Sequence, residues 1–366
     1  MNDGYRSGES DSVWSRTGCA RSFPRMSVPT GPLLSLTRSR LCALLGAAQG
    51  KRVAVVGDAM LDIYLLGDVE RISPEAPVPV VRVRERRLAL GGAANVAQNV
   101  TALGAASTLV SVIGRDANGT LLREMLSAIT DDGAGLLDTS RPTTTKTRVV
   151  ARVQQVVRVD EEDDGDLPAS DAHRLTAVAR EVIARSDALI LEDYNKGVLV
   201  PGVIEDVIAE ARRHAIPIVV DPKFRNFFSY AGATMFKPNR RELESALGAT
   251  LVLDDPDALP VALHRLGVTN LLLTLGEQGM VLVTDQGSIH RVPTTARAVY
   301  DVVGAGDTVT AYVAAMLAAG ASAREAAEVA NVAAGVEVAK LGAATVNSDE
   351  VIAAFDEYQE RSGSAG

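Results

Sequence analysis

The chain has 366 residues, of which 47% are hydrophobic and 23% are charged. This composition is typical of a globular protein and excludes wholesale disorder, and the length predicts either two domains or one large α/β domain with an appendage. The net charge of −9 argues against sequence-independent binding of nucleic acid, because such binding requires a basic surface.

The two cysteines, Cys19 and Cys42, are too few for a disulfide framework or a cysteine-rich metal site. A reducing compartment is the simplest expectation, and we predict a cytoplasmic protein. No apolar run reaches the roughly 18–20 residues that a membrane-spanning helix requires. The longest candidate, Val309–Ala321, suits a buried helix, and Leu41–Ala48 begins too far into the chain for a signal-peptide core. We therefore expect no membrane partner.

The first predicted elements lie between residues 1 and 57. Residues 1–31 are rich in Ser, Gly, Arg and Pro without a hydrophobic period, so we expect a disordered extension, in which Met26 is an alternative start. The leucines of Pro32–Gly50 lie at near-helical spacing and predict a short helix with Pro32 in its first turn. Lys51–Gly57 follows as a largely apolar run, which is the pattern of a buried parallel strand.

Two segments, within about residues 63–87 and 145–160, mix valines with Arg and Gln and predict half-exposed antiparallel strands. Pro74, Pro77 and Pro79 confine the first segment to a sheet edge, because proline cannot donate a hydrogen bond to a neighbouring strand. Strands of this kind need a substrate or a partner subunit to cover them.

After the acidic loop at 161–166, predicted strands and helices alternate, which indicates a parallel sheet with helices on both faces. Helices are predicted at Ala169–Ser186 and Val203–His214. The apolar strand candidates are Ala188–Leu191, Ile216–Val220, Ala233–Phe236, Leu271–Thr274 and Met280–Thr284. Because ligands bind such sheets beyond the carboxyl ends of the strands, we expect the chemistry there.

The strongest local motif is DVVGAGDT at 301–308, which precedes an apolar helix at Val309–Ala319. Gly304 and Gly306 allow the backbone to turn its N–H groups outward at the start of this helix, where the helix dipole favours an anion. Asp307 would lie beside such an anion and could accept a proton from an attacking hydroxyl. An ordinary helix start with Asp307 as its cap explains the motif equally well.

Other polar residues also follow predicted strands. Asp58 and Asp62 come after the first strand and are candidates for binding sugar hydroxyls, or for forming a turn. The Gly91-Gly92 pair precedes a predicted helix and permits a ligand to approach the backbone closely. Further polar loops lie at 192–197, 221–223, 237–242 and 274–279. Each loop has an ordinary structural explanation, but together they indicate a shared site.

Several common binding motifs are absent from the sequence. The first strand is not followed by GxGxxG, and GAAQGK at 46–51 has the wrong glycine spacing for a P-loop. The four histidines are scattered, so a histidine metal site is improbable, and no GxSxG motif marks a serine nucleophile.

Taken in order, these motifs resemble the PfkB, or ribokinase-type, family of carbohydrate kinases over about residues 50–345. The Gly91-Gly92 pair and DVVGAGDT correspond to the two signatures of that family. The resemblance implies an α/β fold, a ribokinase-like doubly wound and mostly parallel sheet flanked by helices, with a small β-sheet lid at 63–87 and 145–160. The kinase domain would span 32–350, and 351–366 would form a C-terminal helix or tail.

Within the family, four segments are most similar to kinases of D-glycero-β-D-manno-heptose 7-phosphate. They are ISPEAPVPVV at 72–81, GGAANVAQN at 91–99, TKTRVVARVQQVVRVD at 145–160 and DYNKG at 193–197. The resemblance implies transfer of phosphate from ATP to the anomeric O1, which gives the 1,7-bisphosphate for ADP-heptose and cell-surface glycan synthesis. Such kinases are often joined to an adenylyltransferase, but the sequence has no HxGH motif, so we expect a separate enzyme for that step.

The resemblance also implies a role for each motif in catalysis and nucleotide binding. Asp307 would be the base that deprotonates the anomeric hydroxyl, and Gly304, Ala305 and Gly306 would form an anion hole for the transferred phosphoryl group. Glu242 would organise Mg²⁺ through water. The residues implied for ATP are Asn239 and Glu242 of an NxxE motif, Thr274, Gly276, Gly279 and Asn331.

The remaining implied residues bind the sugar and a monovalent cation. The sugar hydroxyls would be held by Asp58, Asp62, Gly91, Gly92, Asn95 and Asp193. The candidates for the 7-phosphate are Lys146, Arg148, Arg158 and Lys196, since a phosphate requires cationic partners. Asp301 and Val303 align with a loop that would bind K⁺. The half-apolar outer face of the lid predicts a homodimer.

Two alternatives stay open at this point. Lid residues set the specificity of such kinases, so the substrate could be a different sugar or sugar phosphate, as in fructokinases and ribokinases. A non-catalytic regulator that binds a sugar or nucleotide is the other alternative. Because Asp307 and Glu242 are both present, and a pure binder would need neither a base nor a metal organiser, we favour an enzyme.

Overall fold

The computed structural model describes residues 34–130, 135–152, 154–296, 299–340, 342 and 344–363 of the chain. The extension expected at 1–31 lies outside the described residues, as does Pro32. The first helix, α1, spans Arg38–Ala48 and follows Thr37, whose hydroxyl accepts a hydrogen bond from the Arg40 amide. It starts later than the sequence predicted, because Thr37 provides the N-terminal cap.

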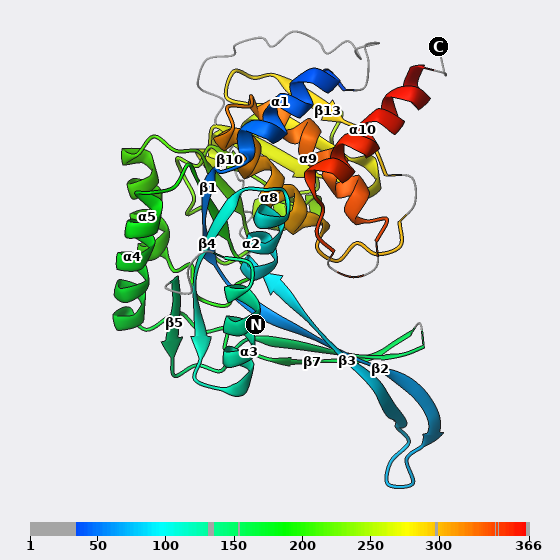
Figure 1. Ribbon diagram of the computed structural model, residues 1–366. Coiled ribbons are helices and arrows are strands. Elements are labelled where there is room, and N and C mark those ends of the chain that lie inside the picture. Colours follow the sequence, from blue (N-terminus) through cyan, green and yellow to red (C-terminus); the bar gives the residue numbers. More distant parts are fainter. Residues whose placement is uncertain are drawn as a thin grey trace, which may run out of the picture.

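A nine-stranded sheet forms the centre of the described structure (Figure 1), in the order β13-β12-β11-β10-β9-β8-β1-β4-β5. Neighbouring strands are parallel except β11–β12 and β12–β13, which are antiparallel. The strands are β1 (Arg52–Gly57), β4 (Ala106–Gly114), β5 (Leu136–Thr139), β8 (Ala188–Glu192), β9 (Ile218–Asp221), β10 (Met235–Phe236), β11 (Asn270–Thr274), β12 (Met280–Thr284) and β13 (Ile289–Val292). The predicted doubly wound, mostly parallel sheet is confirmed.

Helices cover both faces of this sheet and create two apolar clusters. One face carries α1, α2 (Ala93–Ala102), α3 (Ala117–Ser127), α8 (Ala305–Ala318), α9 (Ala323–Glu337) and α10 (Ser348–Gly363). The other carries α4 (Ala169–Ile183), α5 (Pro201–Arg213), α6 (Arg240–Leu247) and α7 (Ala258–Leu266). Successive residues of β1 from Val53 to Val56 alternate between the two clusters, which is why this part of the strand is apolar.

Helix α8 is buried from Asp307 to Met316 and packs against α2 and α9, as expected for an apolar core helix. Because neighbouring structure covers it on several sides, it lacks the single apolar stripe of a surface helix. Among the described residues no helix is both long and apolar enough to cross a membrane.

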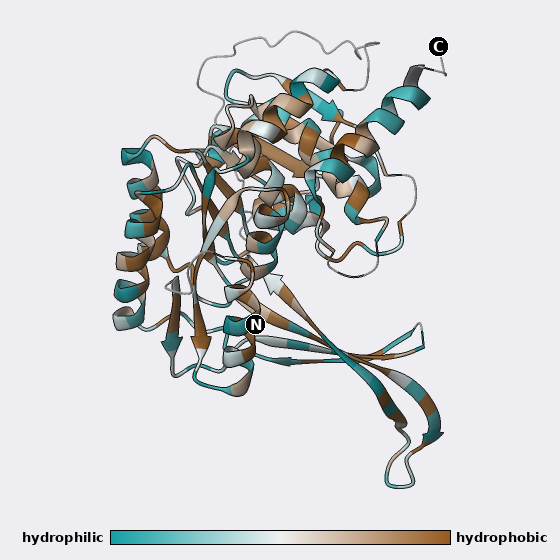
Figure 2. Cartoon of the chain, in the orientation of Figure 1, coloured by the Kyte–Doolittle hydropathy of each residue, from teal (hydrophilic) through white to brown (hydrophobic). Residues whose placement is uncertain are grey.

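The lid is a separate four-stranded sheet that projects from the body (Figure 1), in the order β3-β2-β6-β7. Its strands are β2 (Ala59–Ile72), β3 (Pro79–Gly92), β6 (Thr145–Ala151) and β7 (Gln154–Glu161). The pairs β2–β3 and β6–β7 are antiparallel as predicted, but the central pair β2–β6 is parallel. Pro79 begins an edge strand, the position that its missing N–H allows. Figure 2 shows polar and apolar residues interspersed along the lid.

Candidate active site

The order of the central sheet reverses at β1. The chain first builds β4 and β5 on one side of this strand and then β8 and the later strands on the other. A ligand site is expected at such a reversal, beyond the carboxyl ends of the strands. Asp58 directly follows β1, and Glu192 and Asp221 are the last residues of β8 and β9. Polar side chains that the sequence placed at strand ends therefore gather at this edge.

The N-terminus of α8 lies at the same edge. Gly304 precedes the helix with a φ of +96°, in the left-handed region that glycine adopts without strain. A Cβ atom added to Gly306 would lie 3.6 Å from the Lys237 ammonium group and 3.8 Å from a carboxylate oxygen of Asp221. Because first-turn amides lack acceptors within a helix and the helix dipole favours negative charge, this turn can bind an anion.

Asp307 is not the cap of α8, because Gly304 holds that position. Its carboxylate instead accepts hydrogen bonds from other elements, at 2.6 Å from the Asn95 amide of α2 and at 2.8 Å from the Tyr194 hydroxyl. Burial raises the pKa of Asp307 to about 6, against the lowering effect of these two hydrogen bonds. Asp307 is therefore ionised at neutral pH and has the proton affinity that a general base requires.

Asp307 lines a cavity of about 240 Å³ that opens between α8 and the lid. The lining residues are Met60, Asp62, Gly91, Gly92, Asn95, Lys146, Arg148, Arg158, Tyr194, Val303, Gly304 and Asp307. The volume lies below the ~300–1,000 Å³ of pockets for drug-sized ligands, so the cavity suits a single monosaccharide. Most of the residues predicted to bind the sugar and its phosphate thus meet around one cavity with the predicted base.

Three cations from the lid face this cavity. Arg148 of β6 lies directly opposite Arg158 of β7 in the strand register, and Lys146 lies two residues from Arg148. Since alternate residues of a strand share a face, all three project to the same side of the lid. Like charges directly opposite each other destabilise a sheet, so this face favours an anionic ligand.

Carboxylates of the protein pair with these cations in the absence of a ligand. Arg148 donates to Asp62 at 2.5 Å, and Arg158 donates to Asp160 at 2.9 Å. Lys146 lies 3.2 Å from both Asp160 and Glu162. We refer to Lys146, Arg148 and Arg158 with their carboxylate partners Asp62, Asp160 and Glu162 as the lid cluster.

The glycine pair is required by close packing between the lid and the body. A Cβ atom on Gly91 would lie 2.8 Å from a carboxylate oxygen of Asp62, and one on Gly92 would lie 2.4 Å from the Asp58 carbonyl oxygen. Gly92 also has a φ of +56°, which other residues rarely adopt. The pair therefore lets β3 turn directly into α2, and it brings Asn95 within reach of Asp307.

Three residues predicted to bind substrate have other partners and do not line this cavity. The buried carboxylate of Asp58 accepts hydrogen bonds from the amides of residues 194, 196 and 198. Asp193 accepts from the Tyr230 hydroxyl at 2.7 Å and from the Asn195 amide. Lys196 lies 2.7 Å from Glu162. Asp58 and Asp193 thus hold the 193–198 loop in place, which positions Tyr194.

The residues predicted to bind the nucleotide lie along the β10–β13 half of the sheet. Asn239 pairs with Thr274 in an isolated parallel bridge. Gly276 and Gly279 form the turn between β11 and β12, both with positive φ. Asn331 of α9 donates to the Pro293 carbonyl at 2.8 Å, just beyond β13. In the described structure their polar groups serve local contacts, so a role in nucleotide binding stays a prediction.

The predicted cation ligands are also engaged. Glu242 forms a capping box with Asn239 at the start of α6, and it accepts a hydrogen bond from Lys223 at 2.6 Å. Asp301 accepts from the amides of Val303 and Gly342 and so joins the loop before α8 to the segment after α9.

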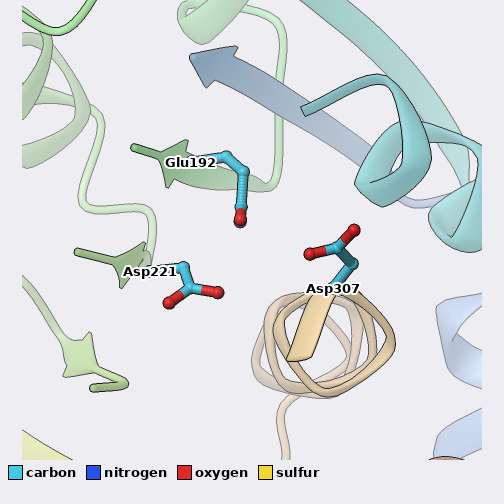
Figure 3. A group of neighbouring side chains, drawn as sticks. All are labelled: Glu192, Asp221 and Asp307. Atoms are coloured by element: carbon cyan, nitrogen blue, oxygen red, sulfur yellow. The ribbon is translucent and has the colours of Figure 1, made fainter. Parts of the chain in front are cut away.

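A buried group of carboxylates lies behind the cavity (Figure 3). Oxygen atoms of Glu192, Asp221 and Asp307 all lie within 4.8 Å of one another. Lys237 is buried beside them and pairs with Asp221 at 2.8 Å. Burial, Asp221 and Asp307 together raise the pKa of Glu192 well above its usual range. We refer to Glu192, Asp221 and Asp307 as the carboxylate triad.

Sequence reasoning found the segments that carry the triad but assigned no role to Glu192, Tyr194, Asp221 or Lys237. Each follows or ends a predicted strand, which was the only available signal. Tyr194 lines the cavity, and burial with neighbouring carboxylates raises the pKa of its hydroxyl well above the usual value. The hydroxyl therefore stays protonated and donates to Asp307.

Comparison with known proteins matches residues 51–350 to the pfkB family of carbohydrate kinases. The chain is 47% identical over 304 residues to the bifunctional protein HldE of Pelobacter propionicus, covering 81% of this chain but only 62% of that protein. Arabidopsis thaliana ribokinase, solved with ribose and ATP, superposes with a TM-score of 0.65 at 22% identity, over 84% of this chain and 99% of the ribokinase. Escherichia coli phosphofructokinase-2, solved with potassium, gives 0.69 at 19% identity, over 85% and 100%. The two solved structures establish the fold.

Proposed function

The chain belongs to the PfkB family of carbohydrate kinases, and from this premise we propose that it phosphorylates D-glycero-β-D-manno-heptose 7-phosphate. The anomeric O1 would receive the γ-phosphoryl group of ATP, which gives the 1,7-bisphosphate for ADP-heptose and cell-surface glycan synthesis. A reaction that consumes ATP belongs to the cytoplasm, in agreement with the low cysteine content.

One observation carries this proposal: the same cavity is lined by a base and by an unusual concentration of cations from the lid. Asp307 lies at the start of α8, and the lid contributes Lys146, Arg148 and Arg158. A sugar that carries a phosphate at one end and a reactive hydroxyl at the other complements both features. An unphosphorylated sugar would offer the opposed arginines no anion beyond their carboxylate partners Asp62 and Asp160.

The residues around Asp307 support its action as a base. Asn95 and Tyr194 each donate a hydrogen bond to the carboxylate, which fixes its position and favours its ionised form. The sugar hydroxyl would transfer its proton to Asp307 as its oxygen attacks the γ-phosphorus in line. The amides at the start of α8 would stabilise the charge on the transferred phosphoryl group. The lid would cover the sugar and exclude water, so that ATP is not hydrolysed.

ATP and Mg²⁺ are the cofactors that a kinase of this family implies. We propose that Asn239, Thr274, Gly276, Gly279 and Asn331 bind ATP, which agrees with their position along one half of the sheet. The carboxylates of Glu242 and the triad suit Mg²⁺, because hard cations prefer oxygen ligands. When bound, Mg²⁺ neutralises charge on the phosphates.

We propose K⁺ as a further cofactor, held near Asp301. Asp301 joins the loop before α8 to the segment after α9, so a cation there would order the anion-binding turn. Both carboxylate oxygens of the neighbouring Glu337 are buried without a hydrogen-bond partner, which agrees with a cation at this place. The E. coli kinase of the same fold was solved with potassium.

A homodimer through the lid is the oligomeric state that we propose. The lid exposes a set of large apolar side chains that a second copy could cover: Val69, Ile72, Val78, Val83, Val156, Val157 and Val159. Val157 and Val159 flank Arg158 on β7, so they lie on the face of the lid opposite to this cation.

The direct test is ADP release by the purified protein with Mg·ATP and a panel of acceptors. The panel contains D-glycero-D-manno-heptose 7-phosphate, sedoheptulose 7-phosphate, fructose 6-phosphate, fructose and ribose. We expect a strong preference for the manno-heptose phosphate. Preference for another acceptor would overturn the substrate but keep the base and the anion-binding turn. No turnover with any acceptor would contradict the proposal as a whole.

A further inference from the structure

Tyr64 of the lid lies directly beside one of the cations that face the cavity. In the strand register it is opposite Arg148 of β6 on one side and opposite Arg87 of β3 on the other. Because Arg148 is in turn opposite Arg158 of β7, these four side chains form one row across the lid. Residues that lie opposite each other in neighbouring strands share a face of the sheet. Tyr64 therefore projects to the same side of the lid as the two arginines of the cavity.

The guanidinium group of Arg148 is held from two directions. Its Cζ atom lies 5.3 Å from the centre of the Tyr64 ring, within the ~6 Å range of a cation–π interaction. Its Nη1 atom donates a hydrogen bond to Asp62 at 2.5 Å. The side chains of Arg148 and Asp62 are only 14% and 7% exposed, so breaking this pair would leave a buried charge without compensation. Arg148 is therefore fixed in place before a ligand binds.

The contacts that fix Arg148 leave one edge of its guanidinium group unused. Within the described part of the chain, the hydrogen bonds that this side chain donates come from Nη1. Nε and Nη2 form the side edge of the planar group, and such an edge can bind two oxygen atoms of a phosphate at once. Since Arg148 lines the cavity, a phosphate there could bind this edge without displacing Asp62.

The other two lid cations of the cavity differ from Arg148 in this respect. Arg158 uses the same edge, Nε and Nη2, to hold both carboxylate oxygens of Asp160 at 2.9 and 3.0 Å. Lys146 also pairs with Asp160, and with Glu162 as well. A phosphate must displace these carboxylates before it can take their place at either cation. Arg148 can instead keep its carboxylate partner and gain a phosphate.

We propose that Tyr64 is a positioning residue, which together with Asp62 holds Arg148 as the anchor for the phosphate of the substrate. Tyr64 does not itself line the cavity, so it acts through Arg148 and not on the ligand. A side chain that is ordered in advance loses less conformational entropy on binding, and the affinity for the phosphate rises accordingly. The inference rests on the proposed function, because that function supplies the sugar phosphate.

The test is a calorimetric titration of the full chain with D-glycero-D-manno-heptose 7-phosphate in the absence of ATP. Tyr64→Leu removes the ring, and we expect it to weaken binding about 5–30-fold, the range of a cation–π contact that is partly shielded from water. Tyr64→Phe keeps the face of the ring and should bind within about twofold of the wild type. In steady-state kinetics the loss in Tyr64→Leu should appear in KM and not in kcat, whereas a general defect of folding would lower kcat.

Arg148→Lys tests the same geometry from the side of the cation. Lysine keeps the charge but cannot offer two parallel N–H groups, so we expect ~10-fold weaker binding. Arg87→Lys is the matched control, since Arg87 lies in the same row but does not line the cavity. Phe228→Leu is the control for Tyr64→Leu, because it removes the ring beside Arg265, outside the lid. Both controls should bind within about twofold of the wild type.

Two outcomes would overturn the inference: a folded Tyr64→Leu variant that binds the heptose phosphate as tightly as the wild type, or a Tyr64→Phe variant that is equally impaired. If Tyr64→Leu does not fold, unchanged binding by Arg148→Lys overturns it instead. These results leave the proposed function untouched if the wild type still releases ADP with the heptose phosphate. Conversely, the expected losses of binding without turnover by the wild type would keep the inference and contradict the function. A wild type that does not bind the heptose phosphate would contradict both.

Discussion

Asp307 belongs to one of two charged groups near the cavity, and these two groups differ in their contact with water. The lid cluster is partly open: the side chain of Arg158 is 50% exposed, while those of Lys146 and Arg148 are 15% and 14% exposed, and each cation already has a carboxylate partner. The carboxylate triad is closed, and Glu192 there has none. Water screens the pair of Arg158 with Asp160, so this pair contributes little stability and can be exchanged for a ligand. The second group is not screened in this way, so its imbalance requires a bound ion or proton.

We therefore expect the lid cluster to bind the phosphate of the substrate. We expect the triad to keep a buried negative charge that a bound ion or a proton compensates. Substitutions at Asp307, which belongs to the triad and also lines the cavity, should have the largest effect. Substitutions in the lid should alter the affinity for the sugar phosphate. The loss of affinity should be larger when a substitution removes more contacts in the cavity.

Replacing Asp307 by Asn should abolish turnover, because the amide cannot accept the proton. We expect kcat to fall by at least ~10²–10⁴-fold, the usual contribution of a general base. ADP release measures this effect, and calorimetry with ATP should give an affinity within about threefold of the wild type, since no proton moves in binding. Activity retained in full would show that Asp307 is not the base.

Replacing Lys146 by Met should reduce kcat/KM for the heptose phosphate by about 10–100-fold, the loss of one charge-assisted hydrogen bond. Turnover of unphosphorylated sugars should change little. Lys196→Met is the matched control, since Lys196 also pairs with Glu162 but does not line the cavity. Equal losses in both variants would break the assignment of the phosphate to the cavity wall.

The pH dependence tests how Asn95 and Tyr194 tune the base. Asp307 must be ionised to accept a proton, so kcat/KM should fall as the pH drops through about 6, the pKa of this group in the free protein. Asn95→Ala removes a hydrogen bond that lowers this pKa. The acid limb should then move upward by about one pH unit. Tyr194→Phe should shift it in the same direction, and an unchanged limb in both variants would contradict the account.

The smallest effect is expected from Asp160→Asn. Asp160 competes with the substrate phosphate for Lys146 and Arg158, so its loss should lower KM about threefold, the scale of a screened ion pair. Steady-state kinetics with the heptose phosphate measure it. Asp356→Asn, which breaks the exposed pair with Arg38, should leave KM unchanged. A higher KM for Asp160→Asn would mean that this carboxylate orients the lid cations.

Local sequence patterns predicted those parts of the fold that depend on the burial and the backbone conformation of a short segment. The apolar run of β1 reflects burial on both faces, and the glycines before α2 and α8 reflect positive φ values that other residues rarely adopt. The strands β4, β5 and β13 were not predicted. β5 and β13 have only four residues each, too few for a reliable period.

The sequence predicted most of the residues that line the cavity, but it also placed Asp58, Asp193 and Lys196 there, missed Tyr194, and could not predict how the side chains pair. The motifs identified Asp307, the glycine turn and the lid cations, because each stands in a recognisable local pattern. They could not show that Asp58 binds three backbone amides or that Tyr194 donates to Asp307. Those contacts join residues more than a hundred positions apart, and no local period encodes them. The unpartnered state of Glu192 emerges only from the packed structure.

The position of the new phosphate on the product tests the central claim most directly. In the proposed mechanism, the hydroxyl beside Asp307 is one that lies far from the phosphate of the substrate. Phosphorus NMR of the product formed from D-glycero-β-D-manno-heptose 7-phosphate and ATP should show a second phosphorus resonance coupled to the anomeric proton. A second phosphate on any other oxygen, or a product that carries no second phosphate, would contradict the proposed mechanism.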